Sequence, residues 1–231
     1  FIASRNFPSF VIIIPFAPGG GQDVLARIIS QELGTLLGDT VIIENRPGAG
    51  GVVGTDDVAK QQPDGDVFVL STLSPIALAR GLPAPVPFDA RTDLVAVAPT
   101  VFVPIALAVT TRNFAPTTAQ DFIATLKAAP GRYQYGSSGI GTSGHIASAS
   151  FCVRTGTDAV HVPYRGGGQV FTALTAGEIQ FCSDIPSLLK GFQDAGTARV
   201  LFVATDQRSS LLPNVPTAAE AGIAGYKSHS W

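Results

Sequence analysis

The chain has 231 residues, of which 45% are hydrophobic and 14% are charged, a composition typical of an ordered globular protein. Fifteen basic and seventeen acidic residues leave a net charge of −2, and no cluster of lysine or arginine is present that would neutralise a row of phosphates. This balance argues against nucleic acid as a partner. The most apolar window, 95–109, is shorter than the roughly 20 residues of a membrane helix and contains two prolines, so no segment is expected to span a bilayer.

Short apolar runs alternate with helical patterns in the first part of the chain. The predicted strands are 11–15, 41–46 and 67–70, and the predicted helices run from Asp23 to Leu37, ending at Gly38, and from the glycine-rich turn 47–51 to about Gln62. Strands that alternate with helices favour a parallel sheet with helices on both faces. A proline-rich segment, 82–88, interrupts this order, and a new set of elements is expected to begin near Val95.

The second part of the chain repeats the alternation. Its predicted elements are the strands 105–109, 132–136, 160–164, 179–182 and 199–203 and the helices 118–128, the run that follows Thr142, and 169–176. The sequence therefore predicts an α/β fold of two lobes, each with a mostly parallel sheet flanked by helices, a crossover near residue 100 and a ligand cleft between the lobes. The expected boundaries are 1–100 for the first lobe and 101–225 for the second.

Three glycine-rich turns each open a predicted helix: 17–23, 137–144 and 165–168. The first backbone N–H groups of a helix have no intrahelical partner, and the helix dipole places partial positive charge there. Glycine lets an anion approach those N–H groups because no Cβ stands in the way. The turns therefore predict anion sites, although each is also explained as a tight turn with a good helix cap.

The segment 139–144 satisfies the G-x-G-x-x-G pattern of dinucleotide-binding folds. That interpretation requires an acidic residue at the end of the next strand to hold the ribose. The next predicted strand ends at Arg165, and Asp158 lies at its opposite end. The pattern therefore fails in its context, and an NAD(P)-dependent enzyme is kept as the weaker alternative.

A hydrolase is also disfavoured. Ser137, Ser138 and Ser143 lie near His145, but none of them is in a G-x-S-x-G motif and no acid is placed to orient the imidazole. Thr142 and Ser143 are ordinary N-cap residues, and His145 is an ordinary first-turn residue. We therefore expect no catalytic residues, no cofactor and no metal. The cysteines, Cys152 and Cys182, are expected to be buried thiols, with a disulfide as the alternative, and they lack the spacing of a zinc site.

Five motifs occur in order between Phe7 and Trp231: "PFAPGGGQDVLAR", "IIENRPGAGG", "YGSSGIGTSGHIA", "VPYRGGGQ" and "LLPNVPTAAEAGI". Together they resemble the TctC, or Bug, family of extracytoplasmic solute-binding proteins of tripartite tricarboxylate transporters. The resemblance implies two α/β lobes of the periplasmic binding protein type II kind that close on a small organic carboxylate. It also implies that residues beyond Trp231 normally complete the first lobe, with 226–231 beginning the return and apolar surface of that lobe exposed without them.

The resemblance implies three ligand-binding loops. Their residues are Phe16, Ala17, Pro18, Gly20 and Asp23 in the first loop, Ser137, Ser138, Gly139, Thr142, Ser143 and His145 in the second, and Tyr164, Arg165, Gly166 and Gly167 in the third, with Asp184 as a further candidate. Phe16 and Tyr164 either stack on an aromatic ligand or pack at the hinge, and the sequence does not favour one of these.

The function implied by the resemblance is capture of a carboxylate outside the cytoplasm and its delivery to the membrane permease subunits of a tripartite tricarboxylate transporter. A periplasmic location, with a signal peptide already removed, and a monomeric state are expected. A ligand sensor that presents its closed form to a membrane receptor shares the same site, and the sequence does not separate it from transport.

Overall fold

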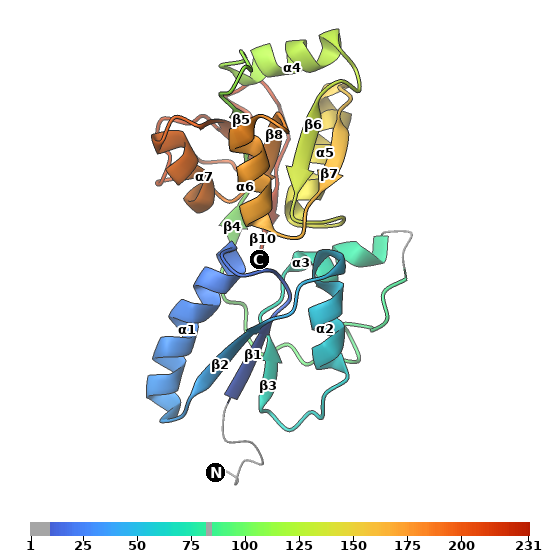
Figure 1. The fold of residues 1–231 in the computed structure, drawn as a ribbon, viewed down its shortest axis with the longest axis vertical. Helices are drawn as coiled ribbons and strands as arrows, with labels where there is room; N and C mark the ends of the chain where they lie inside the picture. Colours follow the sequence, from blue (N-terminus) through green and yellow to red (C-terminus); the bar gives the residue numbers. More distant parts are fainter. Residues whose placement is uncertain (1–9, 82–84) are drawn as a thin grey trace. The chain divides into compact units, whose positions relative to one another are not determined.

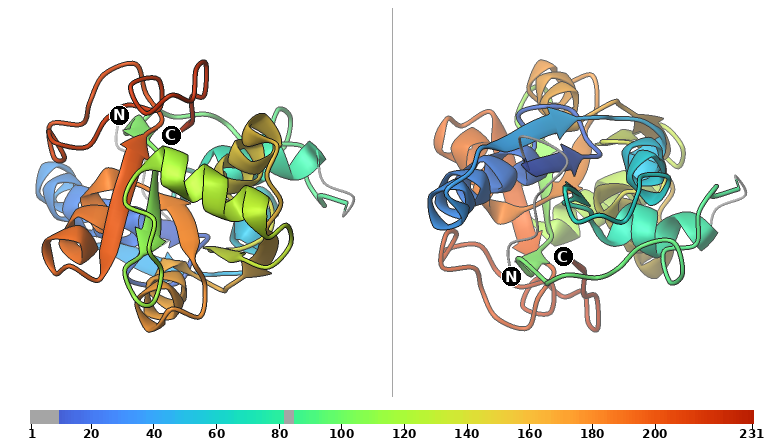
Figure 2. Two further views of the ribbon diagram at one scale, coloured as in Figure 1. Left: turned by 90° about the horizontal axis from the view of Figure 1, so that it is seen from above. Right: turned by 90° about the horizontal axis from the view of Figure 1, so that it is seen from below.

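The computed structural model describes residues 10–81 and 85–231, so the predicted proline-rich break at 82–88 lies partly outside the described residues. The chain divides into two compact units, Phe1–Ala98 and Pro99–Trp231, which we call the first and the second unit. Figures 1 and 2 show the elements of each unit.

The first unit is built on a parallel three-stranded sheet. β1 (Phe10–Ile14) lies between β2 (Val41–Asn45) and β3 (Val67–Val69), and both pairs are parallel. Helix α1 (Gly21–Leu37) connects β1 to β2, and its Ala26 packs with the buried residues of β1. The helix ends as predicted at Gly38, whose φ of 64° is the left-handed conformation that glycine adopts without strain.

The segment between β2 and the end of this unit contains the predicted helix, which is shorter than expected, and two short helices after β3 that were not predicted. A 3₁₀ turn, η1 (Ala49–Gly51), leads into α2 (Val52–Ala59), which ends before the predicted Gln62. Lys60 closes this helix because its N–H donates to the carbonyl of Asp56. After β3 come α3 (Leu73–Ile76) and η2 (Leu78–Gly81).

The second unit contains a five-stranded sheet with the order β7-β6-β8-β5-β9. Its strands are β5 (Ala106–Thr110), β6 (Gln134–Ser137), β7 (Val160–Pro163), β8 (Phe181–Asp184) and β9 (Ala198–Val203). β6 is parallel to β7 and β8, whereas β5 is antiparallel to β8 and β9. Four of the strands therefore run in one direction and only β5 is reversed, in agreement with a mostly parallel sheet.

Helices cover both faces of this sheet (Figure 1). α4 (Ala119–Ala128) and α5 (Ser143–Thr155) pack on one face, and α6 (Gly167–Ala176) and α7 (Pro186–Asp194) pack on the other. Alternate residues of β5 separate the two cores, because Leu107 and Val109 belong to the first cluster and Ala106 and Ala108 to the second. Hydroxyl groups cap two of these helices: Thr118 accepts from the N–H of Asp121, and Thr142 accepts from the N–H of His145.

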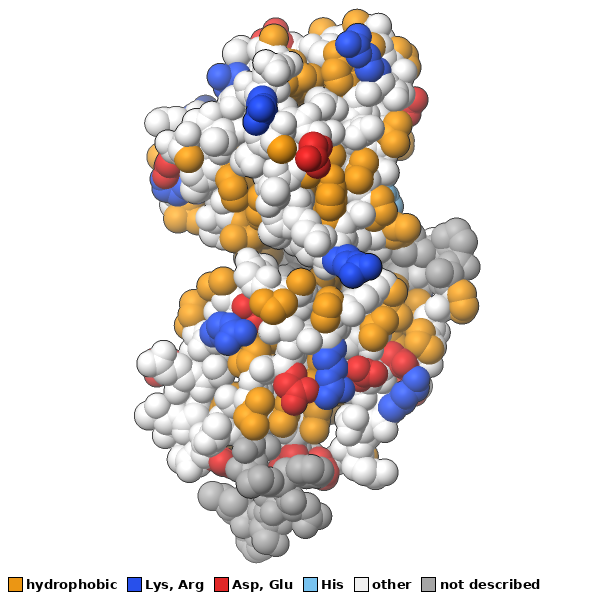
Figure 3. Space-filling view, in the orientation of Figure 1, with side chains coloured by type: hydrophobic (Ala, Val, Ile, Leu, Met, Phe, Trp, Pro, Cys, Tyr) orange, Lys and Arg blue, Asp and Glu red, His pale blue; other side chains and the backbone are white. Residues whose placement is uncertain are grey.

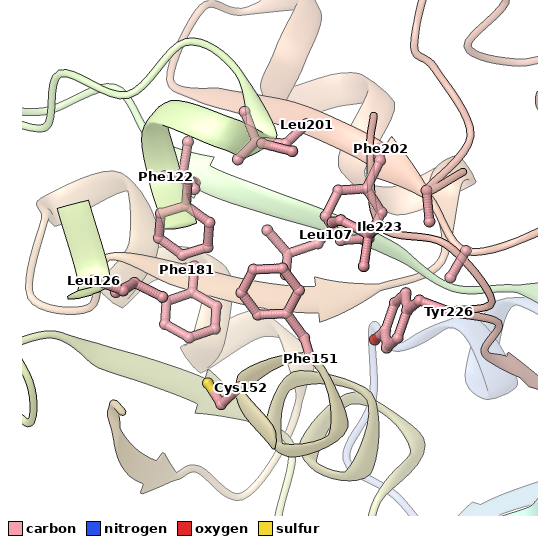
Figure 4. Packing of buried hydrophobic residues seen from close by; sticks show 14 of the residues in the cluster. Leu107, Phe122, Leu126, Phe151, Cys152, Phe181, Leu201, Phe202, Ile223 and Tyr226 are labelled. Carbon is pink, nitrogen blue, oxygen red and sulfur yellow. The ribbon is translucent and has the colours of Figure 1, made fainter. Parts of the chain in front are cut away.

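Aromatic rings fill the core between the sheet and the helices α4 and α5 (Figure 4). Phe122, Phe151 and Phe181 are fully buried, and the centroid of the Phe122 ring lies 5.6 Å from that of Phe151 and 5.0 Å from that of Phe181. Tyr226 closes one end of this core, where its hydroxyl donates to the carbonyl of Ala147 at 2.7 Å. The buried phenol thereby keeps a hydrogen-bond partner.

The sequence did not predict every element. α7 was missed, although Pro186 at its start is a common first-turn residue of a helix. The strand predicted at 179–182 begins later, at Phe181, because Glu178 and Ile179 donate to Ala173 at the end of α6. No helix or strand begins near Val95, since the described strands offer no pairing partner there, and its side chain is 86% exposed.

The chain next forms β4 (Val103–Pro104), which pairs with β10 (His229–Ser230) inside the second unit. The expected return of 226–231 to the first lobe stays a prediction. Both cysteines are buried and free, and burial raises the pKa of each thiol, which agrees with the expectation of two inert thiols. None of the described helices is long and apolar enough to cross a membrane.

Replacing Phe122 by alanine tests the aromatic core. The substitution leaves a cavity between Phe151 and Phe181, so we expect the free energy of unfolding to fall by about 3–5 kcal/mol. Urea unfolding followed by circular dichroism measures the loss. Val153→Ala is the control, because that side chain is 82% exposed on α5 and should change stability by less than about 0.5 kcal/mol. Equal effects of the two substitutions would contradict the described packing.

Candidate functional site

The first loop, residues 15–20, joins β1 to α1 and is shaped by a buried carboxylate. Asp23 Oδ2 accepts hydrogen bonds from the N–H of Gly19 and from Arg27 Nε, each at 3.1 Å. Its Oδ1 accepts from Arg27 Nη2 at 3.1 Å and from Asn45 Nδ2 at 3.0 Å. Asn45 also donates to the carbonyl of Phe16 at 3.1 Å. One carboxylate thus links the loop, the helix and the end of the neighbouring strand β2.

Burial alone would raise the pKa of Asp23, but the hydrogen bonds from Arg27, Gly19 and Asn45 outweigh it and lower that pKa. The carboxylate is ionised at neutral pH, and its oxygens are occupied within the first unit. Asp23 therefore fixes the loop conformation, and its contact with a ligand stays a prediction. Sequence reasoning missed Arg27 and Asn45. The signals were the position four residues after Asp23 on the helix and the polar residue at the end of the next parallel strand.

The remaining predicted residues of the first loop differ in exposure. Pro18 is exposed, Ala17 is partly buried, and Gly20 is the N-cap residue of α1. Phe16 is only 8% exposed, and a Cβ added at Gly51 would lie 3.0 Å from its ring. The ring therefore packs on a glycine of its own unit that no larger residue can replace without a shift.

The second loop, residues 137–142, leaves the end of β6 and enters α5. Gly139 and Gly141 have φ angles of 133° and 79°, which are strained for residues with a side chain. Ser137 Oγ donates to the carbonyl of Gly139 at 2.9 Å, and Thr142 Oγ1 donates to the same carbonyl at 2.8 Å. Ser138 is partly buried beside them. Ser143, the first residue of the helix, donates its hydroxyl to Ser230 Oγ at 2.9 Å.

Two histidines contact polar groups of this loop. His145 Nδ1 accepts the N–H of Gly141 at 3.0 Å, and His161 Nε2 lies 2.7 Å from Ser137 Oγ. The imidazole rings stack with centroids 4.0 Å apart, and Tyr135 stacks on His161 at 4.9 Å. Burial lowers the pKa of both histidines, and that of His161 falls to about 4 because the neighbouring His145 adds to the effect. His161 was not predicted as a site residue, and only the register of β6 and β7 places it beside Tyr135.

The third loop, residues 164–167, follows β7. The N–H of Tyr164 donates to the carbonyl of Ser137 at 2.8 Å, which ties the third loop to the second. The N–H of Arg165 donates to Gln169 Oε1 at 3.0 Å, and the Arg165 side chain is exposed. Gly166 is the N-cap residue of α6, which begins at Gly167.

Asp184 is the last residue of β8. Its Oδ1 accepts the N–H of Ile185 at 2.8 Å, and burial raises the pKa of this carboxyl to about 6. Because β7, β6 and β8 are adjacent and parallel, their carboxyl ends lie at one edge of the sheet. The structure thus brings the second loop, the third loop and Asp184 to the same edge of the second unit. The first loop belongs to the first unit, and its approach to the other two stays a prediction.

The arrangement offers little for covalent chemistry. Ser137 and His161 are within hydrogen-bond distance, as a nucleophile and its base would be, but Ser137 is only 3% exposed and its proton is donated to Gly139. The hydrogen bonds of the described residues include none in which His161 donates to a carboxylate, so the third member of a triad is missing among them. No cluster of three metal-ligating side chains occurs in the described parts of the chain.

The G-x-G-x-x-G segment has a structural reason for its last glycine. A Cβ added at Gly144 would lie 2.4 Å from the carbonyl oxygen of Ser183, so α5 can approach β8 this closely only with glycine there. The end of the next strand carries Arg165 and no acidic residue that could hold a ribose. The glycines therefore shape a short loop between β6 and α5 without the other half of a dinucleotide site.

A cavity of about 300 Å³ lies elsewhere on the second unit. It is lined by Gln120, Ile123, Lys127, Arg154, Thr155, Gly222, Ile223 and Ala224. These residues come from α4, the last turn of α5 and the segment 222–224, and none of them belongs to the three loops. Lysine, arginine, aspartate and glutamate side chains are interspersed with hydrophobic ones on the face shown in Figure 3.

The comparisons with known proteins identify relatives of the whole chain. Residues 25–231 match the family described as "Tripartite tricarboxylate transporter family receptor", TctC. The protein BugT of Bordetella pertussis is 35% identical over 100% of this chain and 71% of its own length. A protein from the tcbD-tcbE intergenic region of Pseudomonas sp. is 36% identical over 97% of this chain and 67% of its own length.

Solved structures show the same fold. A protein of R. palustris solved with adipate has a TM-score of 0.92 and 33% identity, covering 96% of this chain and 75% of the other. MatC of Rhodopseudomonas palustris, solved with bound malate, has a TM-score of 0.91 and 27% identity, covering 97% and 77%. The periplasmic binding protein BugD has a TM-score of 0.91 and 26% identity, covering 96% and 74%.

Replacing Asp23 by asparagine tests its role in the first loop. A carboxylate whose pKa is lowered on folding stabilises the folded state above its unfolded pKa of about 3.9, and that contribution is lost as the pH falls through the folded value. We expect Asp23→Asn to lower the free energy of unfolding by about 1–3 kcal/mol at pH 7, with the gap to the native protein closing below about pH 4. Urea unfolding at pH 7, 5 and 3 measures this gap.

The control is Asp206→Asn, which removes an exposed carboxylate paired with Lys227 and should cost less than about 1 kcal/mol at any of these pH values. A gap for Asp23→Asn that is independent of pH would show that the ionised form is not what the loop requires.

Proposed function

This chain belongs to the tripartite tricarboxylate transporter receptor family, TctC, and we propose that it captures a small organic carboxylate outside the cytoplasm and delivers it to the membrane permease subunits of such a transporter. The members of this family and the structural neighbours are periplasmic solute-binding proteins. Passage of this chain across the membrane with the help of a removed signal peptide is part of the proposal, as is a monomeric working form.

The observation that carries the proposal is the shared edge of the second unit's sheet. Two helix N-termini, those of α5 and α6, begin there directly after the glycine-rich second and third loops. Oriented N–H groups at helix N-termini bind carboxylates without a counter-charge. Arg165 adds one exposed cation at the same edge.

The first loop would receive the other end of the ligand. It opens α1 in the same way, and the network of Asp23, Arg27 and Asn45 holds its backbone rigidly. A ligand with a carboxylate at each end would satisfy both sets of donors, and closure of the lobes would exclude water and strengthen these charge-assisted hydrogen bonds. The structures of relatives with adipate and malate are in keeping with this class of ligand.

Catalysis is not part of the proposal, because in the contact of Ser137 with His161 the serine is buried and its hydroxyl is bonded to the loop. A sensor that presents its ligand-bound form to a membrane receptor would use the same residues. Transport is favoured because the family is described by its transporter.

A thermal-shift screen tests the proposed ligand class. We expect adipate, malate or another carboxylate of similar size to raise the melting temperature, because a ligand at 100 times its dissociation constant adds about 2.7 kcal/mol to the free energy of unfolding. NAD and NADP serve as controls and should give no shift. A rise with the nucleotides and none with carboxylates would contradict the proposal and favour the dinucleotide alternative.

Arg165→Gln tests whether the exposed cation of the third loop contributes to anion binding. Removing one charge-assisted hydrogen bond should weaken the binding of the carboxylate found in the screen about tenfold, as measured by isothermal titration calorimetry. Arg132→Gln, which lies on an exposed loop beside Tyr133, is the matched control and should leave the affinity unchanged. Equal losses in both variants would indicate a general charge effect, and no loss in either would exclude Arg165 from the site.

A further inference from the structure

Three aromatic rings, those of Tyr135, His161 and His145, stack next to the second loop, and we call this stack the column. Tyr135 of β6 and His161 of β7 are register partners in the parallel pair, which places both side chains on the same face of the sheet. Their ring centroids lie 4.9 Å apart, and His145 of α5 continues the column at 4.0 Å from His161, with 18° between the two imidazole planes. The column therefore joins two strands and a helix directly below residues 137–142.

Each histidine is also hydrogen-bonded to the loop, and the partners determine the tautomers. His145 Nδ1 accepts the N–H of Gly141, so this nitrogen carries no proton and the neutral ring is protonated at Nε2. Ser137 donates its only hydroxyl proton to the carbonyl of Gly139. With that proton on Gly139, we assign to His161 the tautomer that donates from Nε2 to Ser137 Oγ, 2.7 Å away.

We propose that His161 is a positioning residue for ligand binding: through its stack on His145 and its hydrogen bond to Ser137 it holds the second loop in one conformation while both rings are neutral. For ligand affinity this inference rests on the proposed function, whereas the hold on the loop does not. In this proposal His161 acts through its contacts with Ser137 and His145 and not through contact with the ligand.

Protonation would disturb this arrangement at a defined atom. A proton added to His145 Nδ1 faces the N–H of Gly141, so an acceptor becomes a second donor and the hydrogen bond is lost. A second positive charge on the stacked ring 4.0 Å away is strongly disfavoured. Burial already lowers the pKa of both rings, so the pair is neutral at pH 7 and acquires its first proton only below about pH 6.5.

The other titratable groups near the column do not change charge in the pH range in which the histidines are protonated. Burial raises the pKa of Tyr135 in β6 to about 12, and burial also raises the pKa of Cys152 in α5, with the carboxylate of Asp158 acting in the same direction. Both groups are therefore neutral when the histidines titrate. Burial alone lowers the pKa of His145, and the one charge that lowers the pKa of His161 further is that of His145.

Two substitutions separate the hydrogen bond of His161 from the stacking of its ring. His161→Phe keeps a stacked ring but removes the donor to Ser137, and His161→Gln restores a donor near the position of Nε2. Val200→Ala is the control for a general loss of stability, because Val200 is buried on β9 at the far edge of the sheet from β7. Hydrogen exchange followed by NMR reports on the loop amides of Gly139, Gly141 and Thr142 in the ligand-free protein.

We expect these amides to exchange at least tenfold faster in His161→Phe than in the native protein and within threefold of the native rate in Val200→Ala. In His161→Gln, which restores the donor but not the stacked ring, the rate should lie between these two limits. ¹⁵N shifts should show His145 unprotonated at Nδ1 at pH 7 in the native protein. Native exchange rates in His161→Phe, or a His161→Gln protein as perturbed as His161→Phe, would overturn the inference.

Calorimetry with adipate and malate then tests the consequence for binding. The dissociation constant should rise about tenfold in His161→Phe at pH 7, and the ratio of the two proteins' constants should approach one between pH 6 and pH 4, as the native pair is protonated. Protonation of the probe itself cancels in that ratio. A ratio independent of pH would contradict the role of the neutral pair. If neither probe nor any other carboxylate binds the native protein, the proposed function fails while the exchange experiment still decides the role of His161.

Discussion

The parallel pairing of β6 with β7 on one side and β8 on the other is the constraint on which the candidate site of the second unit depends. It places the ends of all three strands at one edge, and it sets Tyr135 beside His161 beneath the loop. The pairing leaves no room for a side chain at Gly136, where a Cβ would lie 2.5 Å from Ile179 Cδ1. The same register thus fixes the predicted binding residues and the residues that pack.

In the proposed function both units bind an anion with little net charge. In the first unit the carboxylate of Asp23 is matched by Arg27, and it serves to orient backbone N–H groups and not to repel a ligand. In the second unit His145 and His161 are neutral at pH 7, and Arg165 carries an exposed charge at the edge with the loops. Helix N-termini supply oriented dipoles whose reorganisation costs little when a ligand enters.

The sequence predicted the α/β alternation, the end of α1 at Gly38 and the N-cap at Thr142, because these depend on local patterns of apolar residues, glycine and hydroxyl groups. It could not predict that β5 is reversed, since strand direction depends on contacts between distant segments. The roles of Asn45 and His161 were missed for the same reason: each is an ordinary residue of a strand until the neighbouring strand brings it to Phe16 or to Ser137. Whether the predicted loop residues contact a ligand depends on how the two units approach each other, which no local pattern encodes.

A serine–histidine contact can either take part in catalysis or support a loop, and the contact of Ser137 with His161 has the features of a support. A general base needs a pKa near the working pH and a nucleophile that can reach its substrate. His161 has a pKa of about 4, lowered by burial and by His145, and Ser137 is buried with its proton already committed to Gly139. What makes His161 a poor base makes it a good support, because a ring that is neutral and stacked at pH 7 keeps one hydrogen-bonding pattern there.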